Sequence, residues 1–461
     1  MGGAERGEVD LVVVGSGGAA MAAGIAARRQ GASAVLVESG TLGGTCVNVG
    51  CVPSKTLLAA AGTRHAAQVN PFDGVPTSAG GVDLAALVAQ KDALVQGMRQ
   101  AKYADVAAAH GFSVRHGQAR FRDPLTLEVD GETLRAKAYV VATGAEPARP
   151  DVDGLEDVRW LTSTTAMELT ELPRSLVVVG GGDVGLEQAQ LFAHLGSDVT
   201  LVGRVAPRAE PELAAALRAA LAGDGITVLP EHAVRVAEDG GGVAVTTVSG
   251  TTVRGQRLLV ATGRRPRTGG LGLDAAGVAT DERGFVVVDA EQRTSNPRVL
   301  AAGDVTGAPQ YVYVAAAAGR VAALNALDAG PARVDWTGLP SVVFTRPQLA
   351  SAGLTEAEAR ALGHDTDSRV LAMSAVPRAL VSHDARGAVK VVADAATGAV
   401  LGVHALADGA GDMMLAATYA IRAGMTVDDV ADTWAPYLTT AEALRLTAGL
   451  FRDRMPTSCC A

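Results

Sequence analysis

The feature that most constrains this chain is a strand, a glycine-rich turn, a helix and a second strand, an arrangement that occurs twice. In the first copy, residues 10–14 are mostly apolar, residues 15–20 form the turn, a helical stretch extends to about Gln30, and residues 34–38 form the second strand. Such a turn brings the backbone close to a pyrophosphate at the positive end of the helix, and an acid ending the second strand receives ribose hydroxyls. The predicted cofactor contacts of this copy are Gly15, Gly17, Ala20 and Glu38.

The second copy differs at the end of its second strand. Residues 176–179 and 198–202 are its strands, and the turn between them carries Gly180, Gly182 and Gly185. Val202 and Gly203 stand where the first copy has its acid, and they are followed by Arg204 and Arg208. Because a guanidinium pairs with a 2′-phosphate that a carboxylate would repel, this copy is predicted to bind NADPH. The alternative is that both arginines lie on a solvated loop.

Each copy is followed by a strand that ends in Ala-Thr-Gly, at residues 142–144 and 261–263, which indicates an internal duplication. Thr143, Gly144 and Gly263 are therefore further cofactor candidates. The expected fold class is α/β, with two Rossmann-like domains and a C-terminal α+β domain. The predicted boundaries are 1–150 and 269–335 for the first nucleotide domain, 151–268 for the second, and 336–461 for the last.

Charge and hydropathy limit the partners. The 40 basic and 49 acidic residues give a net charge of -9, which offers no electrostatic footprint for nucleic acid or an anionic membrane. No stretch approaches the roughly 20 apolar residues of a membrane span, because even the alanine-rich run 311–327 contains Arg320. The N-terminus shows no secretory signal, so a cytosolic location is expected. In that reducing compartment the 4 cysteines are expected to be redox or metal-binding groups.

Cys46 and Cys51 lie soon after the first copy. In a regular helix five residues advance about 7.5 Å, beyond the usual limit of about 6.8 Å between disulfide Cα atoms. Either the pair is not bonded or the segment is distorted, and Asn48 and Gly50 favour an irregular helix start. The helix dipole contributes only about 0.3–1 kcal/mol, less than one pKa unit at about 1.36 kcal/mol. A larger shift needs Lys55 or an electron-poor flavin.

The segment from Gly44 to Lys55 resembles the redox-disulfide signature of the flavin-dependent pyridine nucleotide-disulfide oxidoreductases, and the resemblance covers essentially the whole chain. It implies FAD in the first site, contacted by Gly44, Thr45 and Asp304, and a C-terminal dimerisation domain. It also implies that Lys55 pairs with Glu187 beside the isoalloxazine. Cys51 would be the charge-transfer thiolate and Cys46 the thiol that meets the substrate.

Members that reduce organic disulfides carry a His-Pro segment, because the departing thiolate must be protonated by an acid. This chain has Ala435 at the histidine position, followed by Pro436, and its last histidine is His404. We expect His404 to be a satisfied residue on a strand over residues 400–405. The substrate is therefore expected to need no proton.

Cys459 and Cys460 precede the C-terminal residue. Adjacent Cα atoms lie about 3.8 Å apart, below the disulfide range that begins at about 4.4 Å, so a dithiol is expected, and soft thiolates suit Hg(II). Taken alone, the pair could be a chance feature of a frayed end. Together with the missing acid, it resembles the mercuric reductases. That resemblance implies Hg(II) ligation by Cys46, Cys51, Cys459 and Cys460, with Tyr103 and Tyr437 near the metal path.

The reaction implied by this resemblance is transfer of electrons from NADPH through FAD to thiol-bound Hg(II), which leaves as Hg(0). The tail of one subunit would serve the redox pair of its partner in a homodimer. Because Val9 already begins the flavin domain, no separate N-terminal metal-trapping domain is expected. The alternatives are a dihydrolipoamide dehydrogenase or another disulfide reductase, and a flavoprotein that sequesters Hg(II) without turnover.

Overall fold

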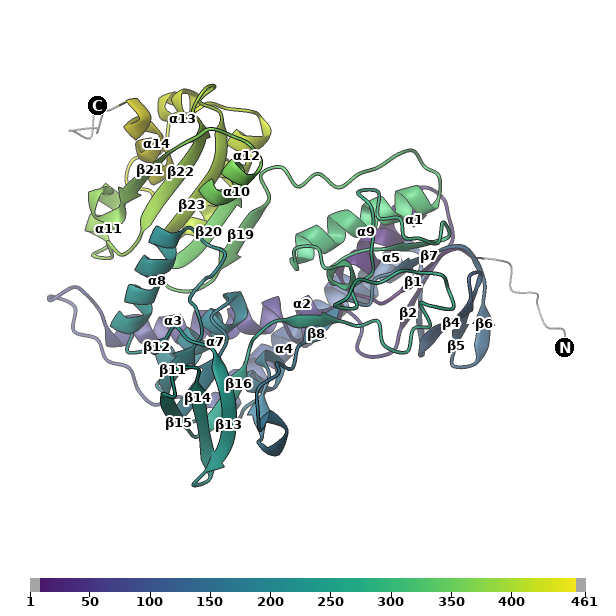
Figure 1. Ribbon diagram of the computed structural model, residues 1–461, viewed down its shortest axis with the longest axis horizontal. Coiled ribbons are helices and arrows are strands. Elements are labelled where there is room, and N and C mark those ends of the chain that lie inside the picture. The colour runs from purple at the N-terminus through teal and green to yellow at the C-terminus, as the bar shows by residue number, and fades with distance from the viewer. Residues whose placement is uncertain (1–8, 453–461) are drawn as a thin grey trace. The chain divides into compact units, whose positions relative to one another are not determined.

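The computed structural model describes residues 9–452, and these divide into two compact units (Figure 1). The first unit holds the chain up to Thr56, Ala85–Ala148 and Gly263–Asp335, and the second holds Leu57–Leu84, Arg149–Thr262 and the chain from Trp336 onward. One boundary between them falls inside helix α3, Cys51–Gln68. Each unit is therefore assembled from segments that are distant in the sequence.

A parallel sheet forms the centre of the first unit, with the strand order β18-β7-β1-β2-β3. Helices α1 and α9 pack on one face, so closely that a Cβ on Gly319 would lie 2.0 Å from the Ala19 carbonyl oxygen. The antiparallel strands β4, β5 and β6 contribute to the core on the other face. The elements are β1 Val9–Val14, α1 Gly18–Arg29, β2 Ala34–Glu38, β3 Ser113–His116, β4 Ala119–Asp123, β5 Thr126–Val129, β6 Glu132–Leu134, β7 Ala136–Val141, β18 Val299–Ala301 and α9 Val312–Ala326.

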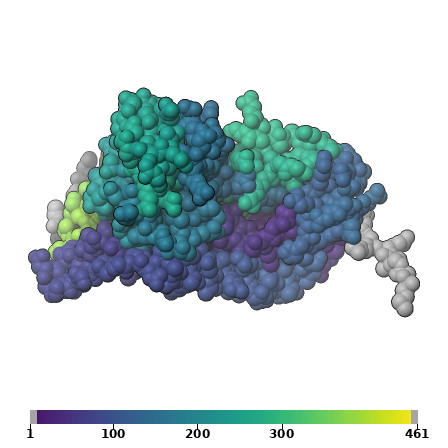
Figure 2. Space-filling model, turned by 90° about the horizontal axis from the view of Figure 1, so that it is seen from below, coloured from purple at the N-terminus to yellow at the C-terminus, as the bar shows by residue number. Residues whose placement is uncertain are grey.

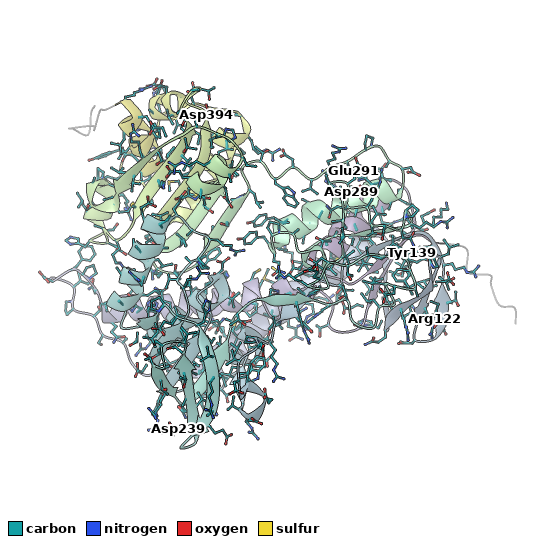
Figure 3. The ribbon with its side chains drawn as sticks, viewed as in Figure 1. Arg122, Tyr139, Asp239, Asp289, Glu291 and Asp394 are labelled. Atoms are coloured by element: carbon teal, nitrogen blue, oxygen red, sulfur yellow. The ribbon has the colours of Figure 1, made fainter. Side chains whose placement is uncertain are left out.

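Tyr139 on β7, labelled in Figure 3, lies in the core between the parallel sheet and strands β4–β6. Its ring is fully buried and lies edge-on to Phe121, with 5.3 Å between ring centroids. The buried hydroxyl donates to the Leu125 carbonyl at 2.9 Å and accepts from the Ala136 N–H at 3.0 Å. The β4–β6 insertion is therefore fixed to the parallel sheet by both apolar and polar contacts.

The second unit repeats this plan. Its parallel sheet has the order β12-β11-β10-β16-β9, and an antiparallel three-stranded sheet again precedes the last strand of the repeat. Figure 2 shows the teal surface of this unit from the side on which that three-stranded sheet lies. The elements are β9 Trp160–Leu161, β10 Ser175–Val179, α7 Asp183–Leu195, β11 Asp198–Val202, α8 Pro211–Gly223, β12 Thr227–Leu229, β13 Ala233–Asp239, β14 Gly242–Thr247, β15 Thr252–Gly255 and β16 Arg257–Val260.

An antiparallel sheet of order β19-β20-β23-β22-β21 forms the C-terminal part of the second unit. Its core holds alternate valines of β22 with methionines of α12 and leucines of α14. His404 on β23 is buried and its Nε2 lies 2.9 Å from the Leu354 carbonyl oxygen, as expected for a satisfied core residue. The predicted α/β fold class with a C-terminal α+β part is confirmed. The elements are β19 Pro340–Val343, β20 Gln348–Gly353, α10 Glu356–Ala361, β21 Thr366–Ala372, β22 Ala388–Asp394, β23 Val400–Ala407, α12 Ala410–Arg422, α13 Val427–Asp432 and α14 Glu442–Gly449.

The alanine-rich run becomes helix α9, which exposes Arg320 while burying most of its alanines. Small side chains on both helices are what allow the close approach to α1. Within residues 9–452, no helix has the length and hydropathy needed to cross a membrane.

Candidate functional site

The first glycine turn lies at the carboxyl ends of the parallel strands. Gly15 has φ 116°, and a Cβ there would lie 2.3 Å from the Ala142 carbonyl oxygen, so only glycine fits. Glu38 ends β2 as predicted, and its Oε2 accepts a hydrogen bond of 2.5 Å from the Ser16 hydroxyl. Ser16 Oγ in turn accepts from the Gly43 N–H at 3.0 Å. The strand-end acid, the turn and the segment leading to the cysteines are thus joined by one hydrogen-bonded chain.

Gly44 and Gly17 make a second close backbone contact at this site. Gly44 has φ 66°, and a Cβ on it would lie 2.6 Å from the Gly17 Cα. Two backbone segments therefore meet without intervening side chains at the N-terminus of α1, with buried Ala20 one turn further on. This bare backbone at a helix N-terminus fits a pyrophosphate such as that of FAD.

Arg264 and Asp304 place two half-buried charges in the same unit. The Arg264 Nε lies 3.9 Å from Asp304 Oδ2, and it is a buried N–H that no group within residues 9–452 accepts. Burial raises the pKa of Asp304, which Arg264 opposes, and burial lowers the pKa of Arg264, which Asp304 opposes. A buried N–H without an acceptor, beside a half-buried carboxylate, fits a polar ligand that completes the site, as the hydroxyls and phosphates of FAD would. Arg264 was not among the predicted residues, although it directly follows the repeated Ala-Thr-Gly.

The redox cysteines lie on two successive helices. Cys46 belongs to α2, Gly44–Asn48, and Cys51 is the first residue of α3. Both are thiols in this structure, and the intervening Val49 and Gly50 interrupt the helix, which confirms the predicted irregular start.

Asn48 stabilises that interruption. Its side-chain amide donates to the carbonyls of Leu42 and Gly44, each at 2.9 Å, and its Oδ1 accepts from Arg99 Nε at 2.7 Å. Asn48 therefore links the short helix α2 to the residues before it and to α4, Leu84–Arg99. The separation of the two thiols follows from the sequence between them.

The two thiols differ in exposure and in proton affinity. Cys51 is exposed, whereas Cys46 is half-buried. The contact with the Cys51 side chain, burial and the charge of Cys51 together raise the pKa of Cys46, and Lys55 lowers it. Cys51 begins an 18-residue helix, and the N-terminus of such a helix favours a thiolate.

The negative charge of Cys51 contributes to raised pKa values of two tyrosines. Burial and the charges of Cys46 and Cys51 raise the pKa of Tyr103 to about 12, so its hydroxyl keeps its proton at neutral pH. Tyr313, in the first turn of α9, likewise has a raised pKa owing to burial, Tyr311 and Cys51. Tyr103 was predicted, whereas Tyr313 was missed because only the fold brings α9 toward α3.

Tyr103 lies on a local irregularity of a long helix over residues 84–110. That helix consists of α4, the π-helical turn η1, Gln100–Ala104, and α5, Asp105–His110. A Cβ on Gly43 would lie 3.5 Å from the Tyr103 ring. The π-helical turn thus places the tyrosine beside Gly43, which immediately precedes the cysteine-bearing helix α2, in keeping with the frequent occurrence of such turns at functional sites.

The second glycine turn repeats the geometry of the first. Gly180 has φ 118°, and a Cβ there would lie 2.3 Å from the Ala261 carbonyl oxygen. Gly185 approaches the Gly180 carbonyl, and Gly182 immediately precedes α7. Arg204 and Arg208 are exposed beyond the end of β11, and Arg208 pairs with Asp183 at 3.3 Å. Their binding to a 2′-phosphate stays a prediction.

The remaining predicted residues fall in several places. The Thr143 hydroxyl donates to the Arg267 carbonyl at 2.7 Å, near Gly144 and Gly263, where β8, Ala145–Pro147, pairs with β17, Arg264–Pro266. Glu187 on α7 is buried and its Oε1 accepts from the Phe344 N–H at 2.9 Å. The structure places Thr45 on α2, Lys55 on α3 in the first unit, and Glu187 and exposed Tyr437 in the second. Cys459 and Cys460 lie outside the described residues.

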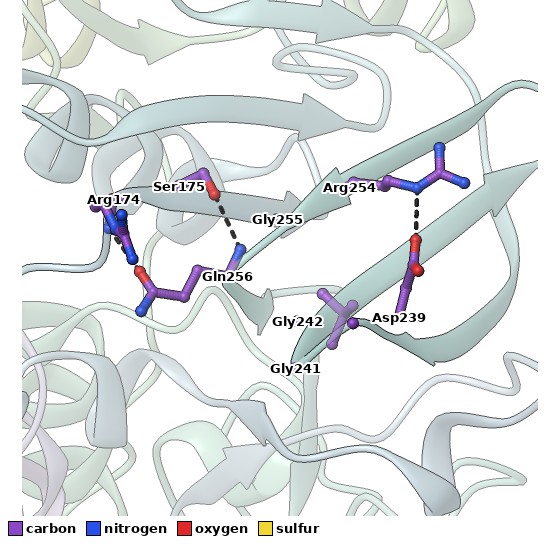
Figure 4. A pocket seen from close by; sticks show the side chains of 10 residues that line it. Arg174, Ser175, Asp239, Gly241, Gly242, Arg254, Gly255 and Gln256 are labelled. Carbon is purple, nitrogen blue, oxygen red and sulfur yellow. Dashed lines mark hydrogen bonds and ion pairs between the residues drawn. The ribbon is translucent and has the colours of Figure 1, made fainter.

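A cavity of about 390 Å³ lies elsewhere in the second unit (Figure 4). Its walls include Arg174, Ser175 at the start of β10, and the Asp239–Arg254 ion pair of the three-stranded sheet. Ligands of such parallel sheets bind at the carboxyl ends of the strands, whereas this cavity is at the amino end of β10. It is therefore separate from the nucleotide site.

Comparison with known proteins places these features in a family. Residues 9–319 match the model of the pyridine nucleotide-disulphide oxidoreductases, and residues 339–448 match the dimerisation domain of the same group. The chain belongs to the pyridine nucleotide-disulphide oxidoreductase family.

Individual relatives narrow the similarity. The chain is 53% identical to the mercuric reductase of Streptomyces lividans, over 98% of both chains, and 44% identical to that of Staphylococcus aureus, over 99% of this chain and 85% of the relative. Among solved structures, the HOCl-induced flavoprotein disulfide reductase RclA from Escherichia coli matches 96% of this chain with a TM-score of 0.85 and 29% identity. LpdA from Mycobacterium tuberculosis matches 96% of it with a TM-score of 0.84.

Proposed function

We propose that the protein is a mercuric reductase that uses NADPH to reduce thiol-bound Hg(II) to Hg(0). The observation that carries this proposal is the 53% identity to the Streptomyces lividans enzyme over 98% of both chains. FAD, when bound in the first unit, supplies the two-electron relay between NADPH and the cysteine pair. Gly15, Gly17, Gly44, Arg264 and Asp304 are the residues that would hold it.

The cysteine pair supplies the ligands for the metal. The N-terminus of α3 favours a thiolate at Cys51, and a second thiolate forms at Cys46 when Hg(II) displaces its proton, because a soft cation stabilises the deprotonated sulfur. Lys55 favours that deprotonation, since its charge lowers the pKa of Cys46. Hg(II) held between the two sulfur atoms accepts two electrons and leaves as Hg(0), and both sulfur atoms remain as thiolates.

The absence of a histidine acid suits this chemistry. Reduction of an organic disulfide releases a thiolate that must be protonated, whereas reduction of bound Hg(II) releases a neutral atom. Ala435 stands at the position of that acid. The protonated Tyr103 hydroxyl beside the pair contributes a polar surface to the path of the ion.

The dimerisation domain supports a homodimer in which Cys459 and Cys460 of one subunit collect Hg(II) for the redox pair of the other. Tyr437 lies on an exposed turn before α14, where Leu438 has φ 62° and the Thr439 hydroxyl donates to the Pro436 carbonyl at 2.8 Å. This fixed turn is suited to presenting Tyr437 to a partner. We expect the enzyme to act in the cytosol, because the reaction needs reduced thiols and NADPH.

The decisive experiment measures mercury vapour released by the FAD-loaded protein given NADPH and thiol-bound Hg(II). Release of Hg(0) without oxidation of NADPH by lipoamide or glutathione disulfide supports the proposal, and Cys51→Ala should abolish it. Brisk turnover of an organic disulfide with no vapour would identify a disulfide reductase instead. Stoichiometric binding of Hg(II) without vapour would identify a sequestering flavoprotein.

A further inference from the structure

Three potential metal ligands meet inside the second unit, away from the cysteines. His65 lies on α3, His194 on α7, and Asp224 caps the C-terminus of α8. Their ligand atoms all lie within 4.8 Å of one another. The side chains of His194 and Asp224 are 3% and 4% exposed, and that of His65 is 16% exposed. The cluster is therefore buried, with one ligand open to solvent.

The Asp224 carboxylate is the centre of this cluster. Its Oδ2 lies 3.0 Å from His194 Nε2 and accepts a hydrogen bond of 2.7 Å from the Gln190 side chain. Its Oδ1 lies 3.6 Å from His65 Nε2. Both imidazoles therefore present the same ring nitrogen, Nε2, to one carboxylate.

The protonation states suit a metal. Burial and the neighbouring His194 lower the pKa of His65, as do Arg386 and Arg346, while Asp224 opposes them. Burial alone would raise the pKa of Asp224, but the hydrogen bonds from His194 and Gln190 and the charge of Arg386 lower it. At neutral pH the cluster thus offers a neutral imidazole and a carboxylate, which are the ligand forms that bind cations.

Arg386 is the group that competes with a cation for Asp224. Its Nη1 lies 3.2 Å from Asp224 Oδ1, while its Nε and Nη2 pair with both carboxylate oxygens of Asp384 at 2.8 Å. Because the bidentate pair with Asp384 is independent of Asp224, the guanidinium can release Asp224 and keep its ion pair.

We propose that His65, His194 and Asp224 form a binding site for a borderline divalent transition-metal ion such as Zn²⁺. Two imidazoles and a carboxylate suit Zn²⁺, and water can complete the coordination through the exposed side of His65. Gln190 would orient the ligating carboxylate. Because the ligands are nitrogen and oxygen atoms, this site is distinct from the thiol site for Hg(II) and does not depend on the proposed function.

Binding requires a local rearrangement. The two imidazole rings are stacked, with 3.7 Å between centroids and an angle of 11° between planes. A metal lies in the plane of each ligating ring, so the rings must turn until both Nε2 atoms point at the ion. Zn²⁺ should therefore replace the stack and join α3, α7 and α8.

The test uses full-length, FAD-loaded protein in which Cys46, Cys51, Cys459 and Cys460 are all replaced by alanine, so that thiols cannot bind the metal. Titration with Zn²⁺ in a calorimeter should show one equivalent, and Zn²⁺ should raise the melting temperature. His65→Ala and His194→Ala should each weaken binding more than about tenfold. His364→Ala is the matched control, because His364 pairs with Asp394 at 3.2 Å and belongs to no cluster of three possible metal ligands within residues 9–452.

Each outcome decides the matter. Loss of the equivalent in both histidine variants but not in His364→Ala supports the site, as does a visible Co²⁺ spectrum that disappears with them. If buried His194 is required for folding, partly exposed His65→Ala with an unchanged flavin spectrum gives the answer alone. Absence of stoichiometric Zn²⁺ binding, or binding that survives His65→Ala, would overturn the proposal.

Discussion

The two nucleotide-binding repeats share the geometry of their glycine turns but differ at the ends of their second strands. The comparison separates the residues that shape the fold from those that select the cofactor. Gly15 and Gly180 have φ values of 116° and 118°, and a Cβ on either would lie 2.3 Å from a carbonyl oxygen of the neighbouring strand. The ends of the second strands are unlike: Glu38 is bound to Ser16, whereas Val202 is followed by exposed Arg204. We therefore expect the turn to set where a pyrophosphate lies and the end of the second strand to set which ribose is accepted.

The largest expected effects come from alanine substitution of Gly15 and Gly180, which should impair different cofactors. Gly15→Ala should yield protein without FAD and without activity, because the added Cβ forces apart β1 and β7. Gly180→Ala should retain FAD but lower kcat/KM for NADPH by about 100-fold, as expected for about 3 kcal/mol of strain. Flavin absorbance and NADPH kinetics measure the two effects. Gly223→Ala, at a glycine with open space around its Cβ, is the control, and equal flavin loss in both turn variants would refute the assignment of cofactors.

Removing the arginines of the second unit should have a smaller effect. Arg204→Ala combined with Arg208→Ala should lower kcat/KM for NADPH by about tenfold and leave that for NADH unchanged, because only NADPH carries the 2′-phosphate. The measurement is the ratio of the two efficiencies. Arg218→Ala, another exposed arginine of the same unit, should not change the ratio. An unchanged ratio in the double variant would mean that the arginines lie on a solvated loop and do not bind the 2′-phosphate.

Ser16→Ala should reveal how much the first unit depends on its own strand end. The substitution removes the hydrogen bond to Glu38 and the acceptor of the Gly43 N–H. Because Glu38 is only half-buried, we expect FAD affinity to fall by less than about tenfold. Flavin release during dialysis measures this change, with Ser39→Ala as the control. Unaltered retention of FAD would show that the backbone alone holds the cofactor.

The sequence predicted the repeated units because glycine spacing and apolar runs report directly on a parallel sheet. It did not lead us to predict β4–β6 and β13–β15, although buried residues alternate with more exposed ones along β5 and β14, which is the pattern of a strand with one face on the core. The cysteine motif and Tyr103 were predictable from a local pattern and a resemblance. Arg264 and the His65 cluster were not, because their significance comes from burial and from neighbours that are remote in the sequence.

The smallest expected effect concerns Lys55 and the Cys46–Cys51 pair of the first unit. Lys55 lowers the pKa of Cys46, and this contribution is weaker than those of Cys51 and of burial, which raise it. Removing a positive charge disfavours the thiolate, so Lys55→Met should raise the pKa of Cys46 further. Because Hg(II) binds the thiolate, the rise of kcat/KM with pH should move to higher pH by less than about one unit.

The pH profile of mercury vapour release measures this shift, and Lys55→Arg should restore the original profile because it restores the charge. Burial and the charges of Cys46 and Cys51 raise the pKa of Tyr103 to about 12, so this tyrosine stays protonated over the working pH range. Tyr103→Phe should therefore change the rate without moving the pH profile. A shift to lower pH in Lys55→Met would contradict the electrostatic role of Lys55. A shift in Tyr103→Phe would instead mean that the tyrosine, rather than the cysteine, titrates in the working range.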